Sequence, residues 1–95
     1  PKSPLAYQSH MLLAQCYIEL KDWQNAVSTF SSIADTYKDK VNADGVLLNM
    51  ALIYNRELKD KVKAKEALER LSKEYPRSKL TKTATALLKE LEKNE

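Results

Sequence analysis

Residue types that could carry out chemistry are scarce in this 95-residue sequence. It contains one histidine, His10, and one cysteine, Cys16. On a helix, a spacing of six residues turns two side chains about 120° away from each other. These two residues therefore cannot bind one metal ion together or act as a nucleophile with its base. The single glycine also excludes a glycine-rich loop that would hold phosphate groups.

The acidic residues form no catalytic pattern either. The 13 Asp and Glu residues are spaced like surface charges among 16 Lys and Arg residues. A scattered pair of carboxylates is the one catalytic arrangement left, and solvated surface charge is the favoured interpretation. We therefore expect a protein that is not an enzyme and that uses no metal and no cofactor.

The remaining reactive or aromatic side chains are better explained by packing. Cys16 lies between Leu13 and Tyr17 on an apolar stripe, which favours a buried small side chain over a reactive thiol. We expect His10 at the edge of the core rather than at a ligand. Trp23, beside Asp22 at a helix start, is expected to pack against the turn.

The composition is typical of one small, soluble, helical domain covering residues 1–95. Hydrophobic residues make up 43% and charged residues 31%, with one Gly and three Pro. This mixture favours helix interiors over strands. No run reaches the roughly 18 apolar residues of a transmembrane helix. The lone Cys16 excludes a disulfide within the chain and leaves the redox compartment open.

The formal charge of +3 is concentrated in the second half of the chain. Residues 1–47 carry four Lys and Arg against five Asp and Glu, while residues 48–95 carry twelve against eight. The positive residues alternate with Glu at helical spacings, as in "KAKEALERLSKEY". This pattern favours a solvated helix face over a nucleic-acid-binding surface, so no nucleic-acid partner is expected.

Periodicity and capping residues predict five helices, covering about residues 3–20, 23–37, 41–58, 61–75 and 78–93. Ser3, Asp22, Asp60 and Ser78 are candidate N-caps. The expected inner face of the first helix consists of apolar residues at steps of three and four: Leu5, Leu12, Leu13, Cys16, Tyr17 and Leu20. Gly45 falls in the first turns of the third helix, where it predicts a close approach of a neighbouring group to the backbone.

A repeat organises these helices. The letters "ELKD" occur at residues 19–22 and again at 57–60, and Ala26 and Tyr37 recur as Ala64 and Tyr75 at the same offset. Short loops make the paired helices antiparallel. We predict an all-α solenoid with repeat 1 at about 3–38, repeat 2 at about 39–76 and a capping helix at about 78–93. Leu20 and Leu58 are expected to anchor the two turns, and the second turn is one residue longer.

Small and aromatic residues in both helix pairs resemble the tetratricopeptide repeat family. The matching positions are Leu13, Ala14, Tyr17, Ala26 and Phe30 in the first pair, and Met50, Ala51, Tyr54, Ala64, Leu68 and Pro76 in the second. The resemblance covers nearly the whole chain. The ending "YPRSKLTKTATALLKEL" is further similar to repeat proteins of the bacterial envelope, of the Tol–Pal-associated and outer-membrane-assembly types. It implies a bacterial protein of the periplasm or envelope, with the cytoplasm left open.

The resemblance implies a partner-binding groove lined by the first helix of each pair. Carried onto this sequence, the groove residues are Gln8, Met11, Gln15, Glu19, Asn49, Leu52, Asn55 and Arg56, with Leu12 and Leu48 beside them. Members that bind chaperones grip a C-terminal carboxylate with Lys and Asn. Because Gln15 and Leu52 occupy the Asn positions, such a clamp is not expected here. The alternative is that these polar residues are only solvated.

The residue patterns and the family resemblance together suggest three functions. The leading one is a non-catalytic scaffold that binds a partner protein or peptide in the groove. The second is self-association, because an incomplete third repeat is expected to leave an apolar face on the fifth helix uncovered. The third and least favoured is nucleic-acid binding by the basic second half.

Overall fold

The computed structural model describes residues 4–38 and 43–93, and these ranges contain five helices. The helices are α1 (Pro4–Glu19), α2 (Trp23–Thr36), α3 (Ala43–Arg56), α4 (Lys61–Glu74) and α5 (Leu80–Lys93). The prediction of an all-α protein with five helices is confirmed. The proposed cap Ser3 and the expected start of the third helix at residue 41 lie outside the described residues.

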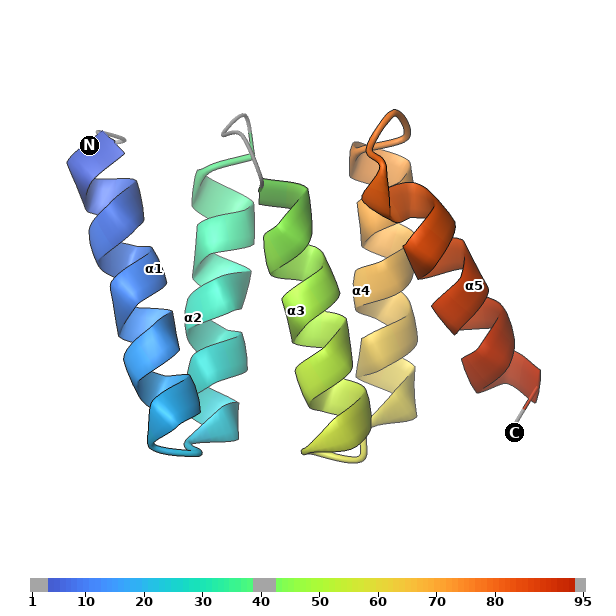
Figure 1. Cartoon of the computed structure of the whole chain (residues 1–95), viewed down its shortest axis with the longest axis horizontal. Coiled ribbons are helices and arrows are strands. Elements are labelled where there is room, and N and C mark those ends of the chain that lie inside the picture. Colours follow the sequence, from blue (N-terminus) through green and yellow to red (C-terminus); the bar gives the residue numbers. More distant parts are fainter. Residues whose placement is uncertain (1–3, 39–42, 94–95) are drawn as a thin grey trace.

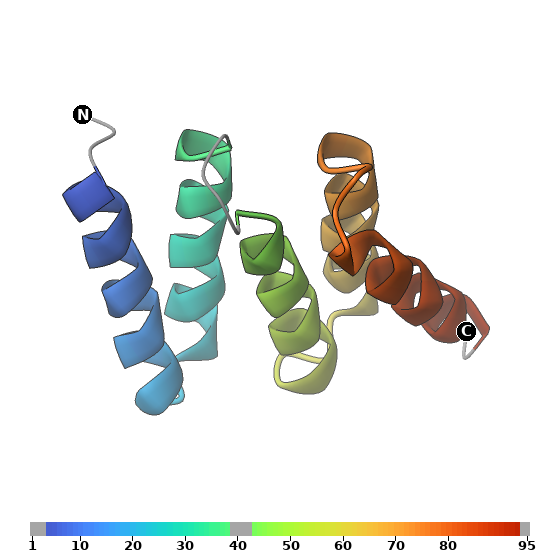
Figure 2. The same ribbon diagram turned by 45° about the horizontal axis from the view of Figure 1, so that its top comes forward.

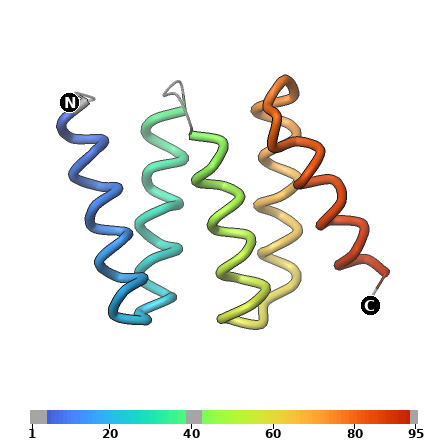
Figure 3. Tube along the Cα trace, in the orientation of Figure 1, coloured from blue at the N-terminus to red at the C-terminus, as the bar shows by residue number. Residues whose placement is uncertain are grey.

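The helices form two layers of antiparallel neighbours (Figures 1 and 2). Each helix packs against the next along the chain, and α3 also contacts α5. The layer of α1, α3 and α5 faces the viewer in Figure 1, with α2 and α4 behind it. The trace in Figure 3 shows the same up-and-down path from one end of the molecule to the other. The predicted arrangement, two helix pairs followed by a single helix, is therefore correct.

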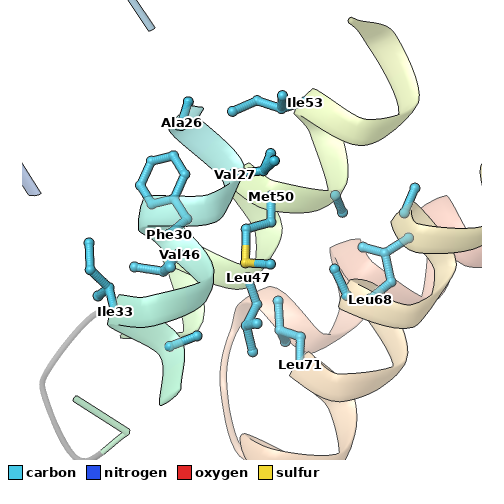
Figure 4. Packing of buried hydrophobic residues seen from close by; sticks show 14 of the residues in the cluster. Ala26, Val27, Phe30, Ile33, Val46, Leu47, Met50, Ile53, Leu68 and Leu71 are labelled. Atoms are coloured by element: carbon cyan, nitrogen blue, oxygen red, sulfur yellow. The ribbon is translucent and has the colours of Figure 1, made fainter. Parts of the chain in front are cut away.

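One continuous hydrophobic core runs between the layers. Phe30 from α2, Leu47 from α3 and Leu68 and Leu71 from α4 are almost completely buried and belong to this one cluster (Figure 4). The four alanines that match the repeat pattern are all buried: Ala14, Ala26, Ala51 and Ala64. Small side chains at these points let neighbouring helices approach closely.

The repeated "ELKD" ends one helix and starts the next. Lys21 and Lys59 both have a positive φ, of 60° and 56°. The N–H groups of Lys21 and Asp22 donate to the carbonyls of Ile18 and Tyr17, which closes α1 with a Schellman motif. Asp22 and Asp60 then cap α2 and α4 by accepting a hydrogen bond from the backbone N–H three residues later, as predicted.

The second turn is longer than the first, as the spacing predicted. The N–H of Asp22 donates to the Tyr17 carbonyl five residues earlier, whereas the N–H of Asp60 donates to the Tyr54 carbonyl six residues earlier. Leu58 is half-buried and packs against the core, so it anchors this turn. Leu20 is 75% exposed, so the prediction that it anchors the first turn is wrong.

The inner face predicted for α1 is also wrong. Leu5, Leu12, Leu13 and Cys16 are exposed, and Ala14 on the opposite side is completely buried. α1 packs on α2 through Ala14 and its neighbours, and no described helix covers the leucine side. Of the apolar set proposed for the inner face, only Tyr17 packs against the core.

Two further expectations are corrected. A Cβ atom added to Gly45 would meet only the Leu80 side chain, at 4.0 Å, which is ordinary van der Waals contact. No close approach therefore requires this glycine. The fifth helix does not expose an apolar face either, because Ala84 and Leu91 are buried and Leu87 and Leu88 pack against the core. The uncovered apolar face lies on α1, at the opposite end of the molecule.

Polar contacts join the second helix pair to the elements on either side of it. The Tyr75 hydroxyl donates to the Lys38 carbonyl at 2.8 Å. The Ser78 hydroxyl donates to the Asp44 carboxylate and accepts from the N–H of Leu80, so Ser78 acts at the start of α5 as predicted. Within residues 4–38 and 43–93, no helix is long and apolar enough to cross a membrane.

Candidate functional site

A shallow hollow of about 470 Å³ runs along the exposed side of α1. Its lining combines apolar and amide side chains: Tyr7, Gln8, Met11, Leu12 and Gln15. The structure thus brings Gln8, Met11 and Gln15 together, because residues three and four apart share one face of a helix. Burial raises the pKa of the Tyr7 hydroxyl, and the charge of Asp44 raises that pKa further.

A second hollow, of about 350 Å³, lies between the start of α2 and the end of α3. It is lined by Trp23, Leu52, Ile53, Arg56 and Glu57. Leu52 and Arg56 belong to the groove set carried over from the sequence. Trp23 was expected only to pack against the turn; it is half-buried against the core and lines this hollow as well. Its place could have been anticipated from the antiparallel packing of α2 on α3, which brings the start of one helix to the end of the other.

The other three candidate residues line neither hollow. Glu19 is exposed in the last turn of α1, Asn49 is exposed on α3, and Asn55 is half-buried near the end of α3. Tyr17 and Tyr54 are equivalent in the two repeats, so Gln15 corresponds to Leu52 and Glu19 to Arg56. Asn49 instead corresponds to Leu12. The carried-over residues therefore spread over a broad surface of α1 and α3.

This surface is nearly neutral. Of the eight candidate residues only Glu19 and Arg56 carry a charge, and they stand at the same end of their helices, one acidic and one basic. Amide side chains can donate to and accept from a peptide backbone, and a guanidinium can bind a carboxylate through two hydrogen bonds. The arrangement is chemically suited to holding a chain of peptide units.

A third hollow, of about 230 Å³, lies between α2 and α4 on the other layer. Its floor is apolar and its rim is charged: Ser31, Leu47, Met50, Tyr54, Lys63, Glu66, Ala67 and Arg70. The ammonium group of Lys63 lies 5.9 Å from the centre of the Tyr54 ring. Met50 and Tyr54 were expected only as positions that match the repeat pattern. Lys63 and Arg70 were not expected in a site, although their spacing of seven residues places both on one face of α4.

The few reactive residues do not converge. His10 is exposed at the edge of the core, where its Nδ1 lies 3.3 Å from the Tyr37 hydroxyl. The Tyr37 ring meets that of Tyr7 edge to face, at 5.2 Å between centres. Cys16 lies on the exposed side of α1, away from this cluster. The part of the chain that the structure describes contains no group of three His, Cys, Asp or Glu residues that could hold a metal ion.

Comparison with known families identifies the repeats. The family model described as Tetratricopeptide repeat matches residues 8–40 and 46–78. The two matched segments each take in most of one helix pair and together cover more than half of the chain. No curated protein matches the sequence.

Proposed function

The chain belongs to the tetratricopeptide repeat family, and from this premise we propose that it binds a segment of a partner protein along the exposed surface of α1 and α3. Repeats of this family are generally protein–protein interaction modules, and they are typically not catalytic. The partner segment would be an extended or helical peptide, and the protein would act as a scaffold.

The observation that carries the proposal is the hollow along α1. Met11 and Leu12 offer an apolar surface for a partner side chain, while Gln8 and Gln15 stand on either side of it with amide groups for the partner's backbone. Binding sites on proteins commonly combine an apolar lining with a few polar groups that fix orientation. Solvation alone would explain the glutamines but not their grouping around exposed apolar side chains.

The α3 part of the surface supplies the second contact. Arg56 lines the hollow formed with Trp23 and is the one cation among the eight candidate residues. We assign it to a carboxylate of the partner, either an acidic side chain or the end of the chain. Asn49 and Asn55, which lie on either side of Leu52 on α3, are assigned to the partner's backbone amides.

The test selects binders from a library of short random peptides displayed on phage and follows one of them by NMR titration of the amide signals. We expect shifts at Gln8, Met11 and Gln15, together with Leu52 and Arg56. Met11→Glu should weaken binding at least tenfold, since an unpaired charge would enter the apolar hollow. Ser28→Glu, on the exposed side of α2, is the matched control. Shifts confined to α2 and α4 would contradict the assigned surface.

We also propose a location in the bacterial envelope, which rests on the sequence resemblance of residues 75–91 alone. The test is fractionation of the source cells with an antibody against this chain. Recovery with periplasmic or membrane fractions supports the proposal, and recovery in the cytosolic fraction rejects it.

A further inference from the structure

A second exposed face of α1 lies beside the hollow, and we call it the leucine stripe. It consists of Leu5, Ser9, Leu12, Leu13 and Cys16 of α1 and of Leu20, which directly follows the helix and continues its hydrogen bonding to the Cys16 carbonyl. The leucines are 72%, 67%, 44% and 75% exposed in this order. The helical angles of the six residues fall within about 100° of one another, on the side opposite the buried Ala14. Leu12 also borders the hollow along α1.

No charged residue lies within the stripe. Residues 4–18 include no Asp, Glu, Lys or Arg, although such residues make up 31% of the whole chain. A helix that is apolar or neutral all round is normally covered on more than one side. Exposed leucines that adjoin in this way indicate an interaction surface rather than a solvated one.

The second repeat shows that a face of this kind is covered elsewhere in the molecule. Ala14 and Tyr17 of α1 correspond to Ala51 and Tyr54 of α3, so Ser9, Leu13 and Cys16 correspond to Val46, Met50 and Ile53. These three residues of α3 are buried in the core beside α2 (Figure 4). In α1 two of the three are replaced by the smaller, less apolar Ser9 and Cys16, so the stripe fits a different partner from a helix like α2.

The spacing of large and small residues in the stripe is self-complementary. Leu5, Ser9, Leu12 and Cys16 follow steps of four, three and four, as the two core positions of a heptad do. One core position holds only leucines and the other only small residues. If a second α1 helix runs antiparallel, Leu12 of each chain meets Ser9 of the other, and Leu5 meets Cys16. Each large side chain then fills the space left by a small one, which gives close packing.

We propose that the leucine stripe is a homodimer interface, in which α1 packs antiparallel to α1 of a second copy. The two-fold axis crosses the stripe at the level of residues 10 and 11 along the helix. A two-fold interface must be self-complementary, and the stripe meets that condition. The antiparallel arrangement also sets the dipoles of the two helices in opposition, and Glu19 of each chain lies toward the positive N-terminal end of its partner. Because residues 4–18 carry no charge, the central part of the interface meets no like-charge repulsion.

The first experiment measures mass against concentration, by sedimentation equilibrium of the whole chain. We expect the mass to rise from one chain to two. Leu12→Lys should weaken the dimer by about 100-fold or more, since an unpaired ammonium group of each chain would be buried in the apolar interface. Val62→Lys is the matched control, because Val62 is a 65% exposed apolar residue on α4. A chain that stays monomeric at every concentration overturns the proposal and assigns the stripe to a helix of different sequence.

The second experiment tests the register by disulfide formation. In the proposed dimer a cysteine at position 5 lies beside Cys16 of the partner, so oxidised Leu5→Cys should run as a covalent dimer. Within one helix these positions are about 16 Å apart, too far for a bridge. Wild-type protein, and Leu5→Cys combined with Cys16→Ser, should both stay uncrosslinked. A dimer that does not crosslink through Leu5→Cys, or that Val62→Lys weakens as much as Leu12→Lys, overturns the proposed interface.

Discussion

The guanidinium of Arg70 in α4 lies 2.8 Å from a carboxylate oxygen of Asp35 in α2, and this ion pair joins the two helix pairs across α3. Arg70 also donates to Glu74, one turn further along α4, at 2.7 Å. Burial acts to lower the pKa of Arg70, but the hydrogen bonds to Glu74 and Asp35 outweigh it and raise the pKa. The Arg70 side chain thus links α4 of the second repeat to α2 of the first.

Asp35→Asn should lower the free energy of unfolding by about 0.5 kcal/mol, because exposed ion pairs contribute only that order of energy. The Asp35 side chain is 65% exposed, so the effect should shrink in high salt. A double-mutant cycle with Arg70→Met, measured by urea unfolding, isolates the coupling. A coupling energy near zero at low salt would show that this contact does not hold the repeats together.

Ala26→Leu should lower the free energy of unfolding by roughly 1 to 3 kcal/mol through overpacking. Ala26 is completely buried at the start of α2, where α2 meets its neighbours, and the additional carbons have no space. Thermal unfolding measures the change. Ala86→Leu on the exposed side of α5 is the control and should leave the melting temperature almost unchanged. Equal melting temperatures for both variants would refute the packing register of the first repeat.

Gly45→Ala should raise the free energy of unfolding by about 0.5 to 1 kcal/mol. Alanine has the higher helix propensity, and it reduces the conformational entropy of the unfolded chain. Gly45 lies in the first turn of α3 without a positive φ, and a Cβ there would only touch Leu80. Urea unfolding of the single variant is sufficient. A loss of stability would mean that the α3–α5 contact is tighter than the 4.0 Å separation indicates.

Much of this fold could be predicted because it is recorded in local signals. Aspartates mark the starts of α2 and α4, and alanines recur where helices cross. The buried side of α1 could not be read in the same way. Its residues are apolar or neutral in nearly every direction, so periodicity alone did not separate the side of Ala14 from the side of Leu12. The choice of the larger leucines as core was wrong because the small alanine is what allows α2 to approach.

The candidate surface was likewise predictable where it depends on one helix and not where it depends on tertiary packing. Gln8, Met11 and Gln15 share a hollow because one helix face fixes their positions, and that much follows from sequence spacing. Trp23 and Arg56 come from different helices, so residue spacing within one helix does not predict that they meet; only the antiparallel packing of α2 on α3 brings them together. The third hollow, between α2 and α4, depends on tertiary packing for the same reason.

The left-handed lysines of the two "ELKD" turns lead to a final prediction. Lys21 has φ 60° and Lys59 has φ 56°, a region in which an L residue pays a steric cost and glycine does not. The chain tolerates this cost because the turn hydrogen bonds of Asp22 and Asp60 require that conformation. Lys21→Gly should therefore raise the free energy of unfolding by about 0.5 to 1 kcal/mol, with Lys59→Gly similar.

The matched control is Lys82→Gly, at an exposed position inside α5, where glycine should cost about 1 kcal/mol. All three variants remove one positive charge, so a general charge effect would shift them in the same direction. Opposite signs for the turn and helix variants, measured by urea unfolding, would establish that backbone conformation decides the outcome. If Lys21→Gly were as destabilising as Lys82→Gly, the lysine side chain rather than the turn geometry would be what stabilises the junction between α1 and α2.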